Sequence, residues 1–108
     1  NPQYIHRVRY EDLLVKPAQT FGGIAKFLEI KPPKNILNKA IKNASFKTLQ
    51  AQEKKDGFLE KSDKAEMFFR SGKAGAWKTT LSADQVKRLV EVHHDKMQEF
   101  GYLKGVSL

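Results

Sequence analysis

Residues 70–78 of the chain read Arg-Ser-Gly-Lys-Ala-Gly-Ala-Trp-Lys, which places three cations and two glycines within nine residues. Glycine lets backbone N–H groups approach a ligand closely, and an arginine fork matches two phosphate oxygens at once. The stretch is therefore typical of an anion site, and a phosphate is the simplest occupant. A solvated basic loop has the same composition, so these residues alone leave both interpretations open.

A helix is predicted just beyond this loop. Ser82 can cap a first helical turn, and Gln85 follows at the spacing of a capping box. The apolar residues that come next recur at helical spacing, which predicts a helix over about residues 83–100, with Gly101 as its stop. Trp77 is the only tryptophan, and we expect it to pack beneath the loop.

The part of the chain before the loop shows two kinds of periodicity. Alternating side chains over residues 4–10 predict a β-strand. Helical spacing predicts three helices, over about residues 17–29, 33–43 and 45–53. Pro17 suits the first turn of the first of these helices, and Ser45 suits the N-cap of the third. Residues 54–81 have no such period and are expected to form a long loop, in which residues 57–69 are a candidate lid.

One strand and four helices leave the strand without a partner in the chain. Backbone donors and acceptors cannot be buried unpaired, so strand 4–10 is expected to pair outside this sequence. The partner would be a second copy of the chain or another part of a larger sheet protein. The sequence also begins at Asn1 and not at methionine, which suggests processing or excision from a longer chain.

Composition narrows the possible functions. A length of 108 residues predicts one domain, and a net charge of +8 favours an anionic partner such as a nucleotide, a nucleic acid, a sulfated polymer or an anionic membrane surface. The chain has no cysteine, which excludes disulfides and thiolate chemistry and fits a reducing compartment, the cytoplasm. No apolar run is long enough to span a membrane. His93 and His94 are adjacent and make a poor metal pair, so no metal site is expected.

Four segments, in order, resemble sulfotransferases that use PAPS, 3′-phosphoadenosine 5′-phosphosulfate. Residues 8–13 with Pro17 are similar to a strand-to-helix segment of that family, and residues 26–30 are similar to the end of the following helix. Residues 44–49 resemble a Thr-Ser-Phe segment, and residues 69–78 resemble the loop Arg-Lys-Gly-x-x-Gly-Asp-Trp-Lys. The resemblance implies that the chain, mainly α with one strand, is the C-terminal portion of a three-layer α/β, P-loop-like sulfotransferase domain.

The resemblance also implies a cofactor site, made by Arg70, Ser71, Gly72, Phe46, Tyr10 and Ser45. The Arg70 guanidinium would hold the 3′-phosphate of PAPS, together with the backbone N–H groups of Ser71 and Gly72. Phe46 would stack on the adenine, and Tyr10 would contact the edge of the ring. The implied reaction moves a sulfuryl group from PAPS to a hydroxyl or amine of a small-molecule or polymer acceptor.

Some positions depart from the family pattern. Ser71 stands where many members have lysine, and Ala44 stands where members have a threonine that helps to read adenine. The family's 5′-phosphosulfate loop and catalytic histidine match no residue of this chain. We therefore assign no catalytic residue, and we expect the isolated chain to be inactive alone and to need the N-terminal half of the same enzyme or a second copy.

Two other functions compete with this interpretation. The charge of +8 is also typical of a small nucleic-acid-binding protein, although no helix–turn–helix, zinc-finger or RNA-binding signature is present. A non-catalytic helical interaction module is the third hypothesis. Nucleic-acid binding would weaken steeply with salt and would show little preference for adenine nucleotides, which separates it from the enzyme hypothesis.

Overall fold

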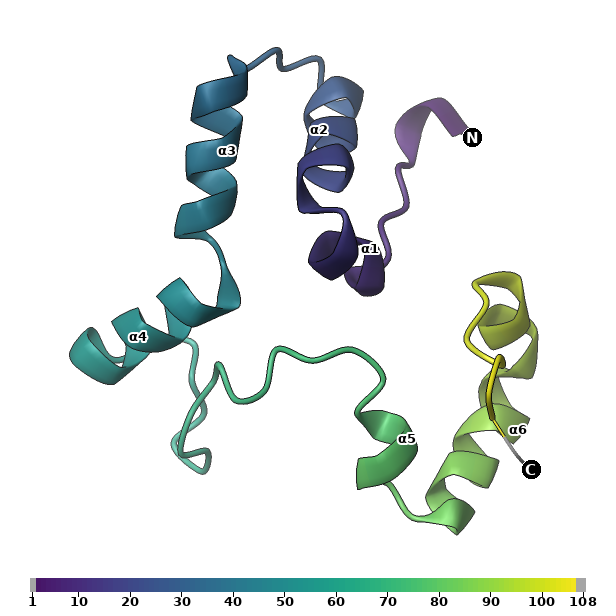
Figure 1. Cartoon of the computed structure of the whole chain (residues 1–108). Helices are drawn as coiled ribbons and strands as arrows, with labels where there is room; N and C mark the ends of the chain where they lie inside the picture. Colours follow the sequence, from purple (N-terminus) through teal and green to yellow (C-terminus); the bar gives the residue numbers. More distant parts are fainter. Residues whose placement is uncertain (1, 107–108) are drawn as a thin grey trace. The chain divides into compact units, whose positions relative to one another are not determined.

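The computed structural model describes residues 2–106 and divides the chain into two compact units, Asn1–Ala74 and Gly75–Leu108. The first unit contains the short 3-10 helix η1 (Pro2–Tyr4) and the α-helices α1 (Tyr10–Val15), α2 (Pro17–Phe27), α3 (Lys34–Asn43) and α4 (Phe46–Asp56) (Figure 1). The second unit contains α5 (Trp77–Thr80) and α6 (Ala83–Glu99). The expectation of a mainly helical chain is therefore confirmed for the described residues.

Helix α2 lies at the centre of the first unit and packs against both α1 and α3. Pro17 occupies the start of α2, where its missing N–H costs nothing because that group would have no helical partner. The Thr20 hydroxyl donates a hydrogen bond to the Asp12 carbonyl at 3.0 Å, which ties α2 to α1. A Cβ added at Gly22 would lie 3.9 Å from Leu37 Cδ2 of α3, so Gly22 lies on the side of α2 that faces α3 and a methyl group would fit there.

The strand predicted over residues 4–10 is wrong for this chain. Tyr4 ends η1, Tyr10 begins α1, and the residues between them form no regular element. Residues 2–106 contain no strand elsewhere either. His6, in that connecting stretch, instead stacks on Phe27 of α2 with ring centroids 5.2 Å apart. The physical reason is that a strand exists only when its backbone pairs, and these residues contain no second strand to pair with.

Helix α4 begins as predicted and ends later than predicted. The Ser45 side chain accepts a hydrogen bond from the Thr48 N–H, so its expected role as N-cap is confirmed. The helix runs to Asp56 and ends at Gly57, whose φ of 77° is in the left-handed region that favours glycine. Beyond Gly57, the expected loop holds a cluster of three aromatic rings, Phe58, Phe68 and Phe69, with centroid separations from 4.7 to 5.0 Å.

The second unit is built on α6. Ser82 and Gln85 form the predicted capping box, with hydrogen bonds of 3.2 Å from Gln85 N–H to Ser82 Oγ and 2.9 Å from Ser82 N–H to Gln85 Oε1. Gly101 follows the helix with a φ of 79°. Helical spacing places His93 on the apolar stripe of α6, but His93 is exposed, and its non-helical backbone (φ −117°, ψ 18°) kinks the helix there.

The long loop also differs from its prediction at its far end, because Trp77–Thr80 forms the short helix α5. Trp77 is half-buried and lines a small hollow with Leu89 and Met97 of α6, which agrees with a packing role. The Lys78 ammonium lies 5.7 Å from the Trp77 ring centroid and donates to the Lys104 carbonyl at 3.1 Å. These contacts fix α5 within the second unit.

Few side chains are buried in either unit. Among residues 3–106, Val90 and Met97 are the only buried hydrophobic residues, and Glu53 is the only buried charged residue. Large apolar side chains such as Val15, Leu28 and Ile36 remain exposed. Apolar surface left in water is surface that gives no burial energy, so the described units gain little stability from a core. None of the helices described in residues 2–106 has the length and apolar character that crossing a membrane requires.

Candidate functional site

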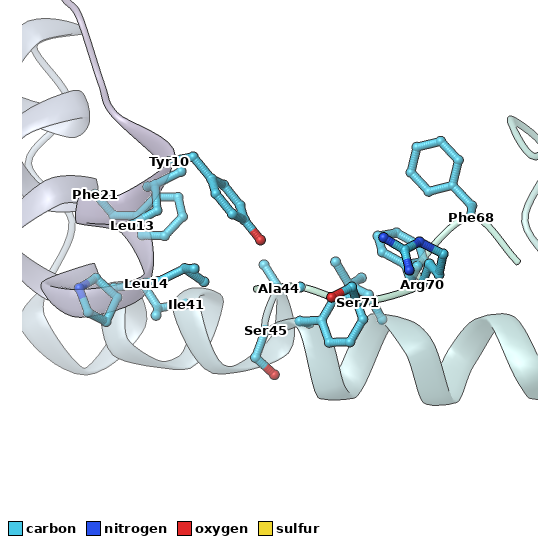
Figure 2. A pocket seen from close by; sticks show the side chains of 15 residues that line it. Tyr10, Leu13, Leu14, Phe21, Ile41, Ala44, Ser45, Phe68, Arg70 and Ser71 are labelled. Carbon is cyan, nitrogen blue, oxygen red and sulfur yellow. The ribbon is translucent and has the colours of Figure 1, made fainter. Parts of the chain in front are cut away.

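A pocket of about 560 Å³ lies in the first unit, where α1, α2, α3 and α4 meet the segment 68–72. This volume is within the range of small-molecule and cofactor pockets. All six residues predicted to bind the cofactor lie in its lining. The full lining is Tyr10, Leu13, Leu14, Pro17, Phe21, Ile41, Ala44, Ser45, Phe46, Leu49, Phe68, Phe69, Arg70, Ser71 and Gly72 (Figure 2).

Arg70 brings a free positive charge to this pocket. Among residues 2–106, no ion pair or hydrogen bond involves its guanidinium, and the side chain is exposed. Figure 2 shows it across the pocket from Tyr10. What makes Arg70 suited to an anion is that all its N–H donors are available in a fixed fork.

The backbone next to Arg70 offers further donors. Within the described residues, the N–H groups of Arg70, Ser71 and Gly72 donate no hydrogen bond to backbone or side chain. Gly72 has a φ of 63°, which a residue with a side chain rarely adopts. Consecutive N–H groups around a left-handed residue can form an anion-binding concavity. The guanidinium and these amides therefore form one electropositive edge of the pocket.

Phe46 lies directly against Gly72. A Cβ built on Gly72 would be 2.4 Å from Phe46 Cγ and 2.6 and 2.7 Å from the two Cδ atoms. A point in the ring plane beyond Cγ would lie clearly farther from the two Cδ atoms than from Cγ. The three distances are similar, so Gly72 lies over a face of the Phe46 ring. Only glycine fits there, and the contact fixes the height of the 70–72 backbone above the Phe46 ring.

Tyr10 and Ser45 lie on other sides of the same pocket. Tyr10 is exposed at the start of α1, and Figure 2 shows its hydroxyl pointing into the space between α1 and the 70–72 segment. The Ser45 hydroxyl is used locally: it donates to Thr48 Oγ1 at 2.9 Å and accepts from Thr48 N–H at 3.3 Å. Figure 2 shows it directed away from the Tyr10 hydroxyl. Ser45 thus shapes the pocket as the N-cap of α4, beside Ala44.

Two residues next to the pocket were missed by the sequence interpretation. Glu53 and Gln50 of α4 make hydrogen bonds to the backbone of Phe68 and Phe69, immediately before Arg70. The sequence held one usable signal: residues 46, 50 and 53 are spaced i, i+4 and i+7, so they share a face of one helix. Nothing in the sequence showed that this face would meet a segment 15 or more residues away.

The donor set of the pocket suits an anion beside an aromatic group. No group of three or more histidine, aspartate and glutamate side chains able to hold a metal ion occurs in the described part of the chain. The pocket instead combines a guanidinium, free backbone amides and an aromatic ring. A guanidinium and amides bind phosphate oxygens, and an aromatic ring offers a surface for a base.

Comparison with known proteins gives the family. The family model described as Sulfotransferase domain matches residues 1–101, almost the entire chain. The chain belongs to the sulfotransferase family. This confirms the family that the sequence resemblance implied.

Individual relatives agree with this membership. The chain is similar to Cytosolic sulfotransferase 17 of Arabidopsis thaliana, with 27% identity over 99% of the chain and 34% of that protein. It is 32% identical to Cytosolic sulfotransferase 12 of Arabidopsis thaliana, over 84% of the chain and 29% of that protein. It is 31% identical to Sulfotransferase 1 family member D1 of Mus musculus, over 83% of the chain and 32% of that protein. The chain therefore spans about a third of the length of these relatives. No solved structure gives a significant match.

Proposed function

We propose that this sulfotransferase chain binds the adenosine 3′-phosphate end of PAPS within an enzyme that sulfates an acceptor hydroxyl or amine. The observation that carries the proposal is the electropositive edge of the pocket. Its unpaired Arg70 guanidinium and the free N–H groups of residues 70–72 lie beside the Phe46 ring. A doubly charged 3′-phosphate next to a purine is the ligand chemistry that such an arrangement fits.

Each pocket residue has a distinct part in this proposal. Arg70 would hold the 3′-phosphate by charge-assisted hydrogen bonds, and Ser71 and Gly72 would donate from their backbone N–H groups. Phe46 would stack on the adenine, and the Tyr10 hydroxyl would contact the ring edge. Ser71 carries no charge, so the 3′-phosphate would rely on the Arg70 guanidinium for its cationic contact. Ala44 lacks a hydroxyl, so this position cannot help to distinguish adenine by a side-chain hydrogen bond.

The chemical step would be completed by residues outside this chain. When bound, PAPS supplies the sulfuryl group that is transferred to the acceptor. The residues described here bind and orient the nucleoside end of PAPS, and correct orientation can lower a barrier by several kcal/mol. We assign no catalytic residue in residues 1–108. The N-terminal half of the same enzyme, or a second copy of the chain, would supply the proton transfer and cover the exposed apolar side chains.

The cytoplasm is the proposed location. The support for it is that relatives of this chain are named cytosolic sulfotransferases. The acceptor is proposed only as a class, a hydroxyl or amine of a small molecule or polymer.

Calorimetric titration of the chain with adenosine 3′,5′-bisphosphate tests the proposal. Arg70→Ala should weaken binding roughly 10- to 150-fold, since hydrogen bonds to charged groups contribute about 1.5–3 kcal/mol. Arg88→Ala is the matched control, because Arg88 is an exposed arginine of α6 in the other unit. Equal affinities of the wild type and the Arg70→Ala variant would contradict the proposal. A parallel titration with duplex DNA tests the nucleic-acid alternative: tight binding that falls steeply with salt, without preference for the nucleotide, would favour it.

A further inference from the structure

We propose that Glu53 is a positioning residue that holds the backbone before Arg70, and so sets the geometry of the 3′-phosphate site. This proposal rests on the proposed function. Glu53 is 8% exposed and is the only charged residue buried among residues 3–106. Its Oε2 accepts a hydrogen bond from Phe68 N–H at 2.7 Å, and its Oε1 accepts one from Phe69 N–H at 2.9 Å.

Gln50, about one turn before Glu53 in α4, adds a third hydrogen bond, and we call these two side chains the clamp. Its Nε2 donates to the Phe69 carbonyl at 3.1 Å. The two α4 side chains therefore satisfy both N–H groups and one carbonyl of the two residues that precede Arg70. Two residues after Arg70, Gly72 rests on the face of Phe46, the first residue of the same helix. One helix thus fixes the segment on both sides of the guanidinium.

A carboxylate suits this role because it offers two acceptor oxygens to two adjacent N–H donors. In Glu53→Gln the amide keeps one acceptor and turns an NH₂ donor towards the second N–H, so one hydrogen bond is replaced by two opposed donors. A buried donor without an acceptor is unfavourable, so the segment would move away from α4. Arg70, Ser71 and Gly72 would move with it.

Whether Glu53→Gln strengthens or weakens binding of the 3′-phosphate separates a positioning role from a simple effect of charge. Glu53 carries a negative charge close to a site proposed for a phosphate, and like charges repel. If charge alone mattered, Glu53→Gln would bind the 3′-phosphate more tightly. If Glu53 acts through the backbone that it holds, the same substitution weakens binding. A purely structural role would weaken binding of any adenine nucleotide to the same extent.

The experiment compares adenosine 3′,5′-bisphosphate with adenosine 5′-monophosphate, which lacks the 3′-phosphate, on the full 108-residue chain. Calorimetry gives the ratio of the two dissociation constants for the wild type, Glu53→Gln and Glu60→Gln. Glu60 is an exposed carboxylate in the loop after α4, so its substitution removes the same charge without touching the clamp. Amide hydrogen exchange at Phe68 and Phe69 measures the clamp directly.

We expect Glu53→Gln to lower the preference for the 3′-phosphate at least tenfold and to lose protection at Phe68 and Phe69, with Glu60→Gln unchanged. A preference that is kept or increased in Glu53→Gln overturns the role of Glu53, and leaves the proposed function intact because the wild type still prefers the 3′-phosphate. A wild type without any such preference overturns both proposals. If Glu53→Gln does not fold, Gln50→Leu decides: a preference lowered severalfold supports the clamp, and an unchanged preference overturns it.

Discussion

Replacing Gly72 with alanine is the substitution whose effect the structure specifies best. The new Cβ would lie 2.4 Å from Phe46 Cγ, whereas ordinary van der Waals contact begins at 3.4 Å. The 70–72 backbone must therefore move by about 1 Å, or the Phe46 ring must leave its place. In catalysis, a misplacement of about 1 Å can cost as much as 10²-fold in rate, and we take the same factor as the scale of the loss in binding. We expect Gly72→Ala to weaken adenosine 3′,5′-bisphosphate binding by about that factor.

The stability of the chain should fall in the same variant for two reasons. A left-handed conformation costs a non-glycine residue about 1–2 kcal/mol, and overpacking typically costs a further 1–3 kcal/mol. Gly75→Ala is the control for the first cost alone, because Gly75 has a φ of 75° and nothing within 4 Å of its ideal Cβ. Denaturant unfolding of both variants then isolates the contribution of the Phe46 ring.

A double substitution tests whether the Phe46 ring causes the extra loss of stability in Gly72→Ala. In a Phe46→Ala background the ring is absent, so Gly72→Ala should cost no more than Gly75→Ala does. Residues in contact are expected to show such a coupling, whereas distant residues are not. If Gly72→Ala destabilises the wild-type chain no more than Gly75→Ala, and leaves nucleotide affinity unchanged, then the ring does not set the position of this backbone and the reasoning is refuted.

Three further predictions address other parts of the chain. Phe46→Ala should weaken adenosine 3′,5′-bisphosphate binding by about 1–3 kcal/mol more than it weakens inorganic pyrophosphate binding, since pyrophosphate has no base to stack on an aromatic ring; an equal loss for both ligands would argue against stacking. Ser82→Ala should lower the free energy of unfolding by about 0.5–2 kcal/mol, seen as a lower Tm by circular dichroism, and an unchanged Tm would mean that the capping box adds nothing. The chain should self-associate through its exposed apolar side chains, so its Tm should rise with protein concentration; a Tm independent of concentration over a hundredfold range would contradict this.

Local signals in the sequence predicted where α4 and α6 begin and where α6 stops. Ser45 and Ser82 cap their helices by side-chain hydrogen bonds to residues three positions later, and Gly101 takes the left-handed conformation expected after a helix. These features depend on a few neighbouring residues, so they can be recognised without knowing the fold. The family resemblance predicted six cofactor-binding residues, and the structure places all six in the lining of one pocket, whereas their role in binding stays a prediction.

Features that depend on distant partners could not be predicted in the same way. The alternating pattern of residues 4–10 suits a strand, but a strand also needs a pairing partner, and Tyr10 begins a helix in its absence. In the sequence, Glu53 is only the polar end of a short predicted helix. Its two hydrogen bonds could not be predicted because their donors lie 15 and 16 residues ahead. His93 lies at a stripe position by helical spacing, yet it is exposed and its own backbone departs from the helix.

The most direct test of the account is the ratio of dissociation constants for adenosine 5′-monophosphate and adenosine 3′,5′-bisphosphate, measured for the wild type and Arg70→Ala. If Arg70 holds the 3′-phosphate, the wild type binds the 3′-phosphorylated nucleotide at least about tenfold more tightly, as expected for one charge-assisted contact, and Arg70→Ala lowers this preference to what the backbone N–H groups of Ser71 and Gly72 supply. Equal affinity of the wild-type chain for the two nucleotides, or a preference that Arg70→Ala leaves unchanged, would contradict this.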